Sequence, residues 1–222
     1  MSTREIVPPG RTQVKRRAQR GRYDRATIDA ILDEGLVCHV GFAQEGYVTV
    51  LPTAYARYGD SLYVHGSTAN RMFRAIRDGA EACVTVTLLD GVVLARSAFH
   101  QSMNYRCVVL YGRAREVAEE NEKLEAMHCL LDHVAPGRWA DVRPPSPQEL
   151  KQTLVLAFPI DEASAKIRSG PPIDDEEDMS APSWAGEIPL RLVAGQPIVA
   201  PDSRVEIPVP DYAAMYFRGA AR

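Results

Sequence analysis

The sequence predicts a mainly β protein, an antiparallel barrel with a few flanking helices. Several short runs are rich in Val, Thr and Tyr, residues that favour strands. Turns containing glycine separate these runs, which favours hairpin connections between consecutive strands. Few helical patterns interrupt them, and no long internal repeat is apparent. Together these observations favour an antiparallel barrel.

The N-terminal sequence is expected to form an arm and then a helix, ahead of the first strand. Residues 1–22 carry a dense basic cluster and are expected to form a flexible or partner-bound arm. Asp24 is a typical N-cap for the helix that follows, and Gly35 ends it. The apolar face of this helix consists of Ile28, Ile31 and Leu32.

Five strand-like runs follow, with one helix among them. The runs are residues 36–43, 47–58, 61–65, 81–89 and 92–98. The pair Asp90-Gly91 is expected to form a turn between the last two. A short helix after the third run carries Arg71, Arg74 and Arg77, and Gly79 ends it.

The second half predicts a long strand, a helix and an extended C-terminal segment. Residues 105–117 are the longest strand candidate, with Gly112 as a bulge or bend. The residue pattern predicts a helix over 119–134 and a strand over 153–159. The buried face of that helix is expected to consist of Leu124, Met127, Leu131 and Val134. From Trp184 onward, a returning segment is expected to dock on the barrel.

Composition excludes several classes of protein. A net charge of −3 argues against nonspecific nucleic-acid binding. No apolar run reaches the roughly 18–20 residues that span a bilayer, and no signal-peptide core is present, so a cytoplasmic location is expected. The four cysteines form no CxxC pair, which indicates reduced thiols, and no metal site is predicted from them or from the five histidines. The acidic run at 174–178 offers oxygen ligands of the kind that magnesium or calcium prefers, but a solvated loop is the preferred interpretation.

One segment points to anion binding. The run at 61–65 leads into Gly66, Ser67 and Thr68 and then into the helix that carries Arg71. Free N–H groups at a helix start, the helix dipole and two hydroxyls together favour an anion. Arg71 adds a planar fork of donors suited to phosphate. The alternative is an ordinary N-cap with surface arginines.

Three motifs in order resemble the flavin-binding split-barrel family, in its branch related to pyridoxamine 5′-phosphate oxidase, and the nitroimidazole-reductase-like proteins within it. The motifs are Val50-Leu51-Pro52-Thr53, His65-Gly66-Ser67 with Asn70-Arg71-Met72, and Asn104-Tyr105-Arg106-Cys107. The resemblance covers about residues 23–160. It implies a split β-barrel domain there and a C-terminal extension, 161–222, that packs on the barrel or on a partner subunit.

The resemblance also implies roles for individual residues in binding FMN. Leu51, Pro52 and Thr53 would line the flavin ring. The phosphate side would consist of His65, Gly66, Ser67, Thr68, Asn70, Arg71 and Met72. Tyr105, Arg106 and Cys107 would reach the cofactor from across the site, with pairing to a carboxylate as the alternative for Arg106. Trp184 would close the site, with Arg191 as a looser counterpart, and docking of the C-terminal segment is the alternative for Trp184.

The chain departs from the family pattern at several positions. Arg71-Met72 replaces the Arg-Lys pair of the oxidases, and neutral residues replace their first-strand arginine and lysine, with Thr53 in the lysine's place. Arg71 stands where the nitroimidazole-reductase-like proteins often have a histidine tied to their proposed chemistry, and Cys107 stands where serine is usual. These departures weaken vitamin B6 oxidation and nitroimidazole reduction as specific assignments. No catalytic residue is identified, because a flavin carries the redox chemistry itself.

The function expected from the resemblance is an FMN-dependent oxidoreductase that acts on a small molecule, with a reduced nicotinamide or a small substrate as electron donor. FMN is preferred to FAD because the chain has no second glycine-rich turn of the dinucleotide type. A homodimer with the flavin at its interface is expected, since a small barrel leaves strand edges open. The alternatives are a heme- or deazaflavin-binding protein, with His65 or His100 as the axial ligand of a heme, and a non-catalytic flavin-binding or regulatory protein.

Overall fold

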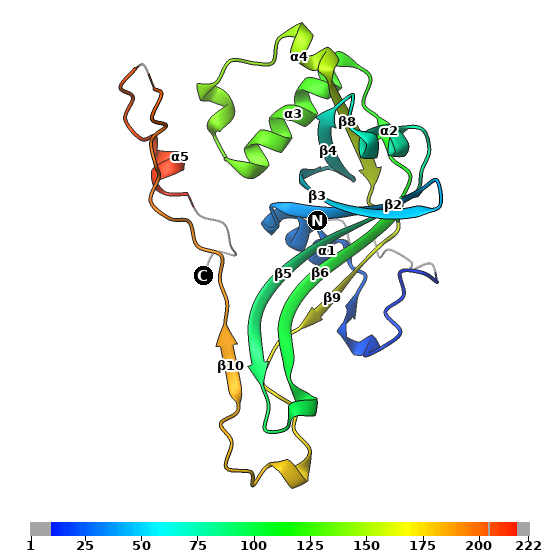
Figure 1. Cartoon of the computed structure of the whole chain (residues 1–222), viewed down its shortest axis with the longest axis vertical. Helices are drawn as coiled ribbons and strands as arrows, with labels where there is room; N and C mark the ends of the chain where they lie inside the picture. The colour runs from blue at the N-terminus through cyan, green and yellow to red at the C-terminus, as the bar shows by residue number, and fades with distance from the viewer. Residues whose placement is uncertain (1–9, 204, 217–222) are drawn as a thin grey trace.

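The computed structural model describes residues 10–203 and 205–216, and it confirms the mainly β, antiparallel architecture (Figure 1). The strands are β1 (Gly21–Arg22), β2 (Val37–Gln44), β3 (Tyr47–Tyr58), β4 (Ser61–Ser67), β5 (Ala82–Leu94), β6 (Ser102–Gly112), β7 (Arg115–Glu116), β8 (Thr153–Pro159), β9 (Ala163–Arg168) and β10 (Gly186–Pro189). The α-helices are α1 (Arg25–Glu34), α2 (Arg71–Arg77), α3 (Glu120–Val134), α4 (Pro147–Gln152) and α5 (Asp211–Ala214). Four 3-10 turns are η1 (Ala18–Arg20), η2 (Ala98–His100), η3 (Arg138–Asp141) and η4 (Glu176–Asp178).

One sheet curls around the main core. Its strand order is β1-β9-β6-β5-β2-β3-β4-β8-β7, and β10 pairs with β5 outside this path. The consecutive strands β8 and β9 lie near opposite ends of the order, so their short connection brings the two ends together. Buried side chains from both ends, such as Leu156 of β8 and Ala165 of β9, belong to one hydrophobic cluster. The sheet continues past Ile160, because β9 pairs with β6.

The first helix forms as its sequence predicts. The Asp24 carboxylate accepts a hydrogen bond from the Thr27 N–H at 2.8 Å, and Gly35 ends α1. Its apolar face packs into the main core. The buried Tyr55 hydroxyl donates to the Leu32 carbonyl at 2.6 Å, which ties the end of α1 to β3.

The predicted turn at Asp90-Gly91 is wrong. These residues lie within the continuous strand β5, where a register shift between Leu89 and Gly91 marks a bulge. A Cβ at Gly91 would lie 3.0 Å from the Ile188 carbonyl oxygen of β10. Glycine here therefore permits the close approach of a neighbouring strand rather than a chain reversal.

The predicted strand over 105–117 is also divided differently. It begins earlier as β6 and ends at Gly112, and the separate strand β7 pairs with β8.

Helix α3 covers the outside of the barrel rather than its interior. A second cluster forms between α3 and the strands. Its members are Ala56, Tyr63, Val117, Ala126, Leu130, Val155 and Ala157. The stripe expected to be buried on this helix is only partly so: Met127 and Leu131 are half-buried, and Val134 is 37% exposed. These side chains are not fully buried because they face an open cavity.

Both terminal segments contact the sheet of their own chain. Arg11 of the basic arm forms ion pairs with Glu81 and Glu162, so this part of the arm is held on its own sheet, while residues 1–9 lie outside the described residues. At the other end, β10 docks on β5 as expected. The extended chain then runs along the side of the molecule to α5 (Figure 1). Within the described part of the chain, no helix is long and apolar enough to cross a membrane.

Candidate functional site

Gly66 has a packing role that the sequence did not indicate. A Cβ at this position would lie 2.5 Å from Cε2 of Phe73, a buried residue of α2. Glycine therefore allows the helix to sit close against the end of β4.

The turn after β4 leaves polar groups exposed beside α2. The Asn70 side chain caps α2 by accepting from the Met72 N–H at 2.9 Å, and the Thr68 N–H donates to the Gln152 carbonyl at 3.0 Å. These two donors are therefore occupied within the protein. The Ser67 and Thr68 side chains and the Arg71 guanidinium remain exposed. Arg71 donates to the Gln44 side chain at 3.3 Å, which orients it toward the end of β2.

Strand β3 presents an exposed apolar edge. Leu51, Pro52 and Thr53 pair with residues of β2. Just before them, Val48 is 80% exposed and Val50 is 58% exposed. Both valines line a groove of about 480 Å³ that runs across β2, β3 and β5. This groove is the open apolar surface next to the strand expected to contact a flavin ring.

The other half of the predicted site lies elsewhere on the sheet. Tyr105, Arg106 and Cys107 belong to β6, and strands β2 and β5 lie between β6 and β3. Three strand spacings correspond to about 14 Å. A single chain therefore does not bring these residues to Leu51–Thr53.

Arg106 binds carboxylates of its own chain. Its guanidinium forms a two-pronged ion pair with Glu34 and donates to Asp90 at 2.7 and 2.9 Å. Hydrogen bonds to Glu34 and then to Asp90 raise the pKa of Arg106. This is the carboxylate pairing that the sequence left open as the alternative to cofactor binding.

Trp184 and His100 lie away from the end of β4. The Trp184 ring is 67% exposed and rests on Gly186 at the start of β10. His100 is in η2, between β5 and β6, and its Nε2 lies 3.0 Å from the Asp175 carboxylate. Figure 1 shows this end of the β5–β6 hairpin at the opposite side of the molecule from α3.

An apolar cavity of about 540 Å³ lies under α3, η3 and α4, against β3 and β4. Its walls are Ala54, His65, Met127, Leu130, Leu131, Val134, Trp139, Val142, Arg143, Pro145 and Glu149. This volume falls within the range of small-molecule and cofactor sites. Most of the lining is aliphatic, and the charged pair Arg143 and Glu149, 2.7 Å apart, is exposed.

His65 is a polar side chain that lies among the apolar walls, apart from the exposed pair Arg143 and Glu149. Its side chain is exposed because it opens onto the cavity, yet the surrounding protein removes enough water to lower the pKa of the imidazole. A lowered pKa favours the neutral ring, which is the form that binds a metal. Among the described residues, no hydrogen-bond partner of the His65 ring is found.

Sequence reasoning named His65 but missed the cavity around it. The available signal was the apolar stripe of Met127, Leu131 and Val134 on the helix, followed by the apolar residues Trp139 and Val142 in the next segment. All five residues line the cavity. Helical periodicity alone cannot separate a stripe that packs on protein from one that faces a ligand.

Known proteins resemble this chain over most of its length. The family model for pyridoxamine 5′-phosphate oxidase matches residues 24–167. The flavocytochrome Anf3 from Azotobacter vinelandii is 42% identical, with 96% of this chain and 99% of that one covered and a TM-score of 0.90. A FAD and heme binding protein from Mycobacterium smegmatis is 38% identical, with 87% and 95% covered and a TM-score of 0.83.

A more distant structure shares the fold alone. It is described as a 5-nitroimidazole antibiotic resistance protein from Bacteroides thetaiotaomicron and is 22% identical, with 66% of this chain and 86% of that one covered and a TM-score of 0.56. No curated protein matches the chain in sequence.

Proposed function

Because the chain belongs to the pyridoxamine 5′-phosphate oxidase family, we propose that it is a redox protein that binds both a flavin and a heme. The observation that carries the heme half is the His65 imidazole, which has no partner among the described residues and opens into an apolar cavity. The descriptions of the Azotobacter and Mycobacterium proteins support the same pair of cofactors. This choice favours the heme alternative that the sequence left open.

The residues of the cavity fit a heme. A heme is a flat apolar macrocycle with carboxylates at one edge, and it needs an axial ligand on iron. His65 would supply the nitrogen ligand, and Leu130, Leu131 and Val142 are among the apolar walls. Arg143 is exposed and forms an ion pair with Glu149, so it is a cation that a heme carboxylate could also pair with.

The flavin half rests on the end of β4 and on β3. Arg71, Ser67 and Thr68 would hold a phosphate, and the backbone at Leu51–Thr53 would face the ring. The sequence argument favours FMN, whereas the 38%-identical relative is described as binding FAD, so we propose FAD as the bound form. The phosphate contacts at Arg71 apply to either flavin.

The two proposed sites share one strand. Ala54, which lines the cavity, directly follows Thr53 on β3. A flavin supplies one- and two-electron transfer, and a heme supplies one-electron transfer at iron. In this proposal the two sites meet at adjacent residues of β3, and the desolvation that lowers the pKa of His65 favours the neutral imidazole that would bind the iron. An oxidoreductase that takes electrons from a reduced nicotinamide or a small substrate is the activity that this arrangement supports.

We also propose that the working form is a two-fold homodimer. The exposed apolar residues Val48, Val50 and Leu51 provide a surface for a second copy to cover. Tyr105 and Cys107 lie far from β3 within one chain. In a dimer, the second copy would supply these two residues to the flavin site on β3. The four free cysteines support a cytoplasmic location.

Flavin binding is tested by the variant Arg71→Ala. It should weaken binding of FAD and FMN roughly ten- to hundred-fold, because a charged hydrogen bond contributes about 1.5–3 kcal/mol. Binding of riboflavin, which lacks the phosphate, should change little. Arg74→Ala on the same helix is the matched control. Equal losses for riboflavin and the phosphorylated flavins would show that Arg71 does not contact phosphate.

The dimer is tested by sedimentation velocity of the cofactor-loaded protein. A monomer that retains flavin at micromolar concentration would show that one chain completes the site.

A further inference from the structure

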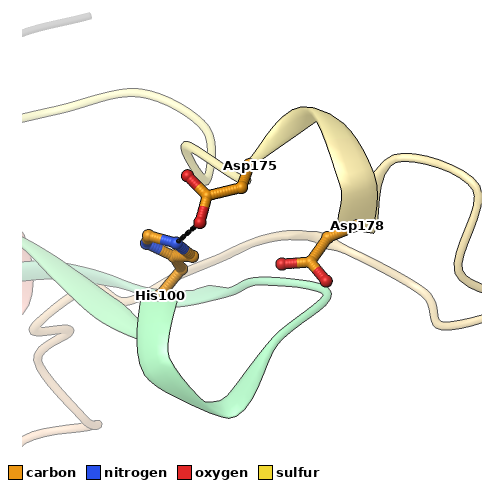
Figure 2. A group of neighbouring side chains, drawn as sticks. All are labelled: His100, Asp175 and Asp178. Atoms are coloured by element: carbon orange, nitrogen blue, oxygen red, sulfur yellow. Dashed lines mark hydrogen bonds and ion pairs between the residues drawn. The ribbon is translucent and has the colours of Figure 1, made fainter.

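Three side chains of metal-binding types lie close together at the end of the β5–β6 hairpin, outside the two proposed cofactor sites (Figure 2). They are His100 of η2, Asp175, and Asp178 of η4. One ligand atom from each lies within 4.8 Å of the others. Figure 2 shows both carboxylates directed into the space beside the imidazole. The two segments are 75 positions apart in the sequence, as measured between His100 and Asp175.

Contacts outside the group hold the acidic segment in place. The neighbouring Asp174 is almost fully buried, with 1% of its side chain exposed. Its carboxylate accepts from the Arg96 backbone N–H at 2.8 Å and from the Arg96 guanidinium at 2.7 Å. Asp174 is therefore neutralised by an ion pair, and its anchoring fixes where the next residues begin.

The histidine segment is fixed as well. The Gln101 side chain accepts from the Ala95 N–H at 3.1 Å and donates to the carbonyls of Ala95 and Ser97 at 2.9 and 3.0 Å. These bonds close the turn that carries His100. Both segments are thus positioned by residues that do not belong to the group.

One carboxylate of the group has no donor among the described residues. His100 contacts Asp175 at 3.0 Å, while no donor among the described residues binds the Asp178 carboxylate. Arg96, the cation bound to this segment, is occupied by Asp174. One imidazole nitrogen and two carboxylates form a donor set typical of zinc, which accepts His nitrogen and Asp oxygen and tolerates a fourth position held by water.

We propose that His100, Asp175 and Asp178 form a binding site for a divalent transition metal, with zinc as the fitting ion. The metal would join the hairpin to the loop that leads into β10. The donor set, with its nitrogen ligand, favours zinc over magnesium or calcium, which prefer all-oxygen sites. The sequence expectation of a solvated acidic loop overlooked His100, because that residue is distant along the chain.

The test is calorimetric titration of zinc chloride into the full chain, purified with its cofactors bound and freed of metal by a chelator. The wild-type protein should bind one zinc ion per chain. His100→Ala and Asp178→Asn should each weaken binding by more than about tenfold, since even outer-shell partners of a metal commonly contribute 10–100-fold. Glu177→Gln, an exposed neighbour of Asp178 in the same turn, should bind as the wild type does.

A second measurement does not depend on the variants. Saturating zinc should slow proteolysis of the wild-type loop at 169–182, because the metal links it to the hairpin. Cobalt(II) absorption should report a histidine-containing site that His100→Ala abolishes. Absence of zinc binding to the wild type, wild-type affinity in His100→Ala, or an equal loss in Glu177→Gln would overturn the proposal.

Discussion

Replacing Gly66 by alanine gives a sharp test of the packing at the end of β4. The new Cβ would lie 2.5, 2.9 and 3.0 Å from three atoms of the Phe73 ring. Phe73 is among the fully buried side chains of the core, so its ring has little room to withdraw. Overpacking of this kind costs about 1–3 kcal/mol. In a chain of this size, 1 kcal/mol lowers Tm by roughly 2–4 °C, so the expected decrease is about 2–12 °C.

Thermal unfolding followed by circular dichroism measures this decrease. Gly112→Ala is the matched control, because a Cβ there meets nothing within 4 Å and the backbone is not left-handed. Phe73→Leu removes the ring atoms that the new Cβ would meet. The decrease in Tm of the double variant Gly66→Ala/Phe73→Leu should therefore be smaller than the sum of the two single decreases. A wild-type Tm for Gly66→Ala would refute the reasoning. If flavin affinity fell while Tm was unchanged, Gly66 would serve cofactor approach, as the sequence suggested.

Three further predictions concern charge and burial. Arg106→Gln should lower the free energy of unfolding by about 1–3 kcal/mol in denaturant titration, because its two carboxylate partners lose their cation; no change would show that the pairing is not stabilising. The hydrogen bond from Arg143 lowers the pKa of Glu149 to about 2 from its ordinary 4.5, so its stabilisation is full above pH 4.5 and lost as pH falls toward 2. The Tm difference between wild type and Glu149→Gln should therefore vanish across that window, and a constant difference would contradict the assignment. Burial raises the pKa of the Cys38 thiol to about 12, so iodoacetamide should leave Cys38 unlabelled in the native protein and label it in denaturant, as mass spectrometry can show.

Local signals in the sequence predicted much of the fold. Asp24 and Gly35 mark the two ends of α1, as the sequence predicted. Such ends are predictable because helix capping depends on residues only a few positions apart. The pair Asp90-Gly91 misled for the converse reason: a glycine that admits β10 beside it looks the same as a glycine in a turn. Which of the two applies depends on Ile188, a residue far along the chain.

The candidate site was predictable only in parts. The sequence singled out His65 and Arg71, yet it could not separate a phosphate role for His65 from an axial one, because that depends on the cavity formed by α3. Met127 and Leu131 were expected to be buried, since periodicity reports an apolar face and not what covers it. Arg106 was ambiguous until its partners Glu34 and Asp90 were in place.

The absorption spectrum of the purified protein, after reconstitution with hemin and FAD, tests the central claim most directly. The proposal predicts flavin bands together with a Soret band in the wild-type protein. In His65→Ala the Soret band should be lost or shifted while the flavin bands remain, because the variant removes only the nitrogen that is proposed to bind the iron. A wild-type protein without a Soret band, or an unchanged one in His65→Ala, would contradict the assignment of the cavity as a heme site.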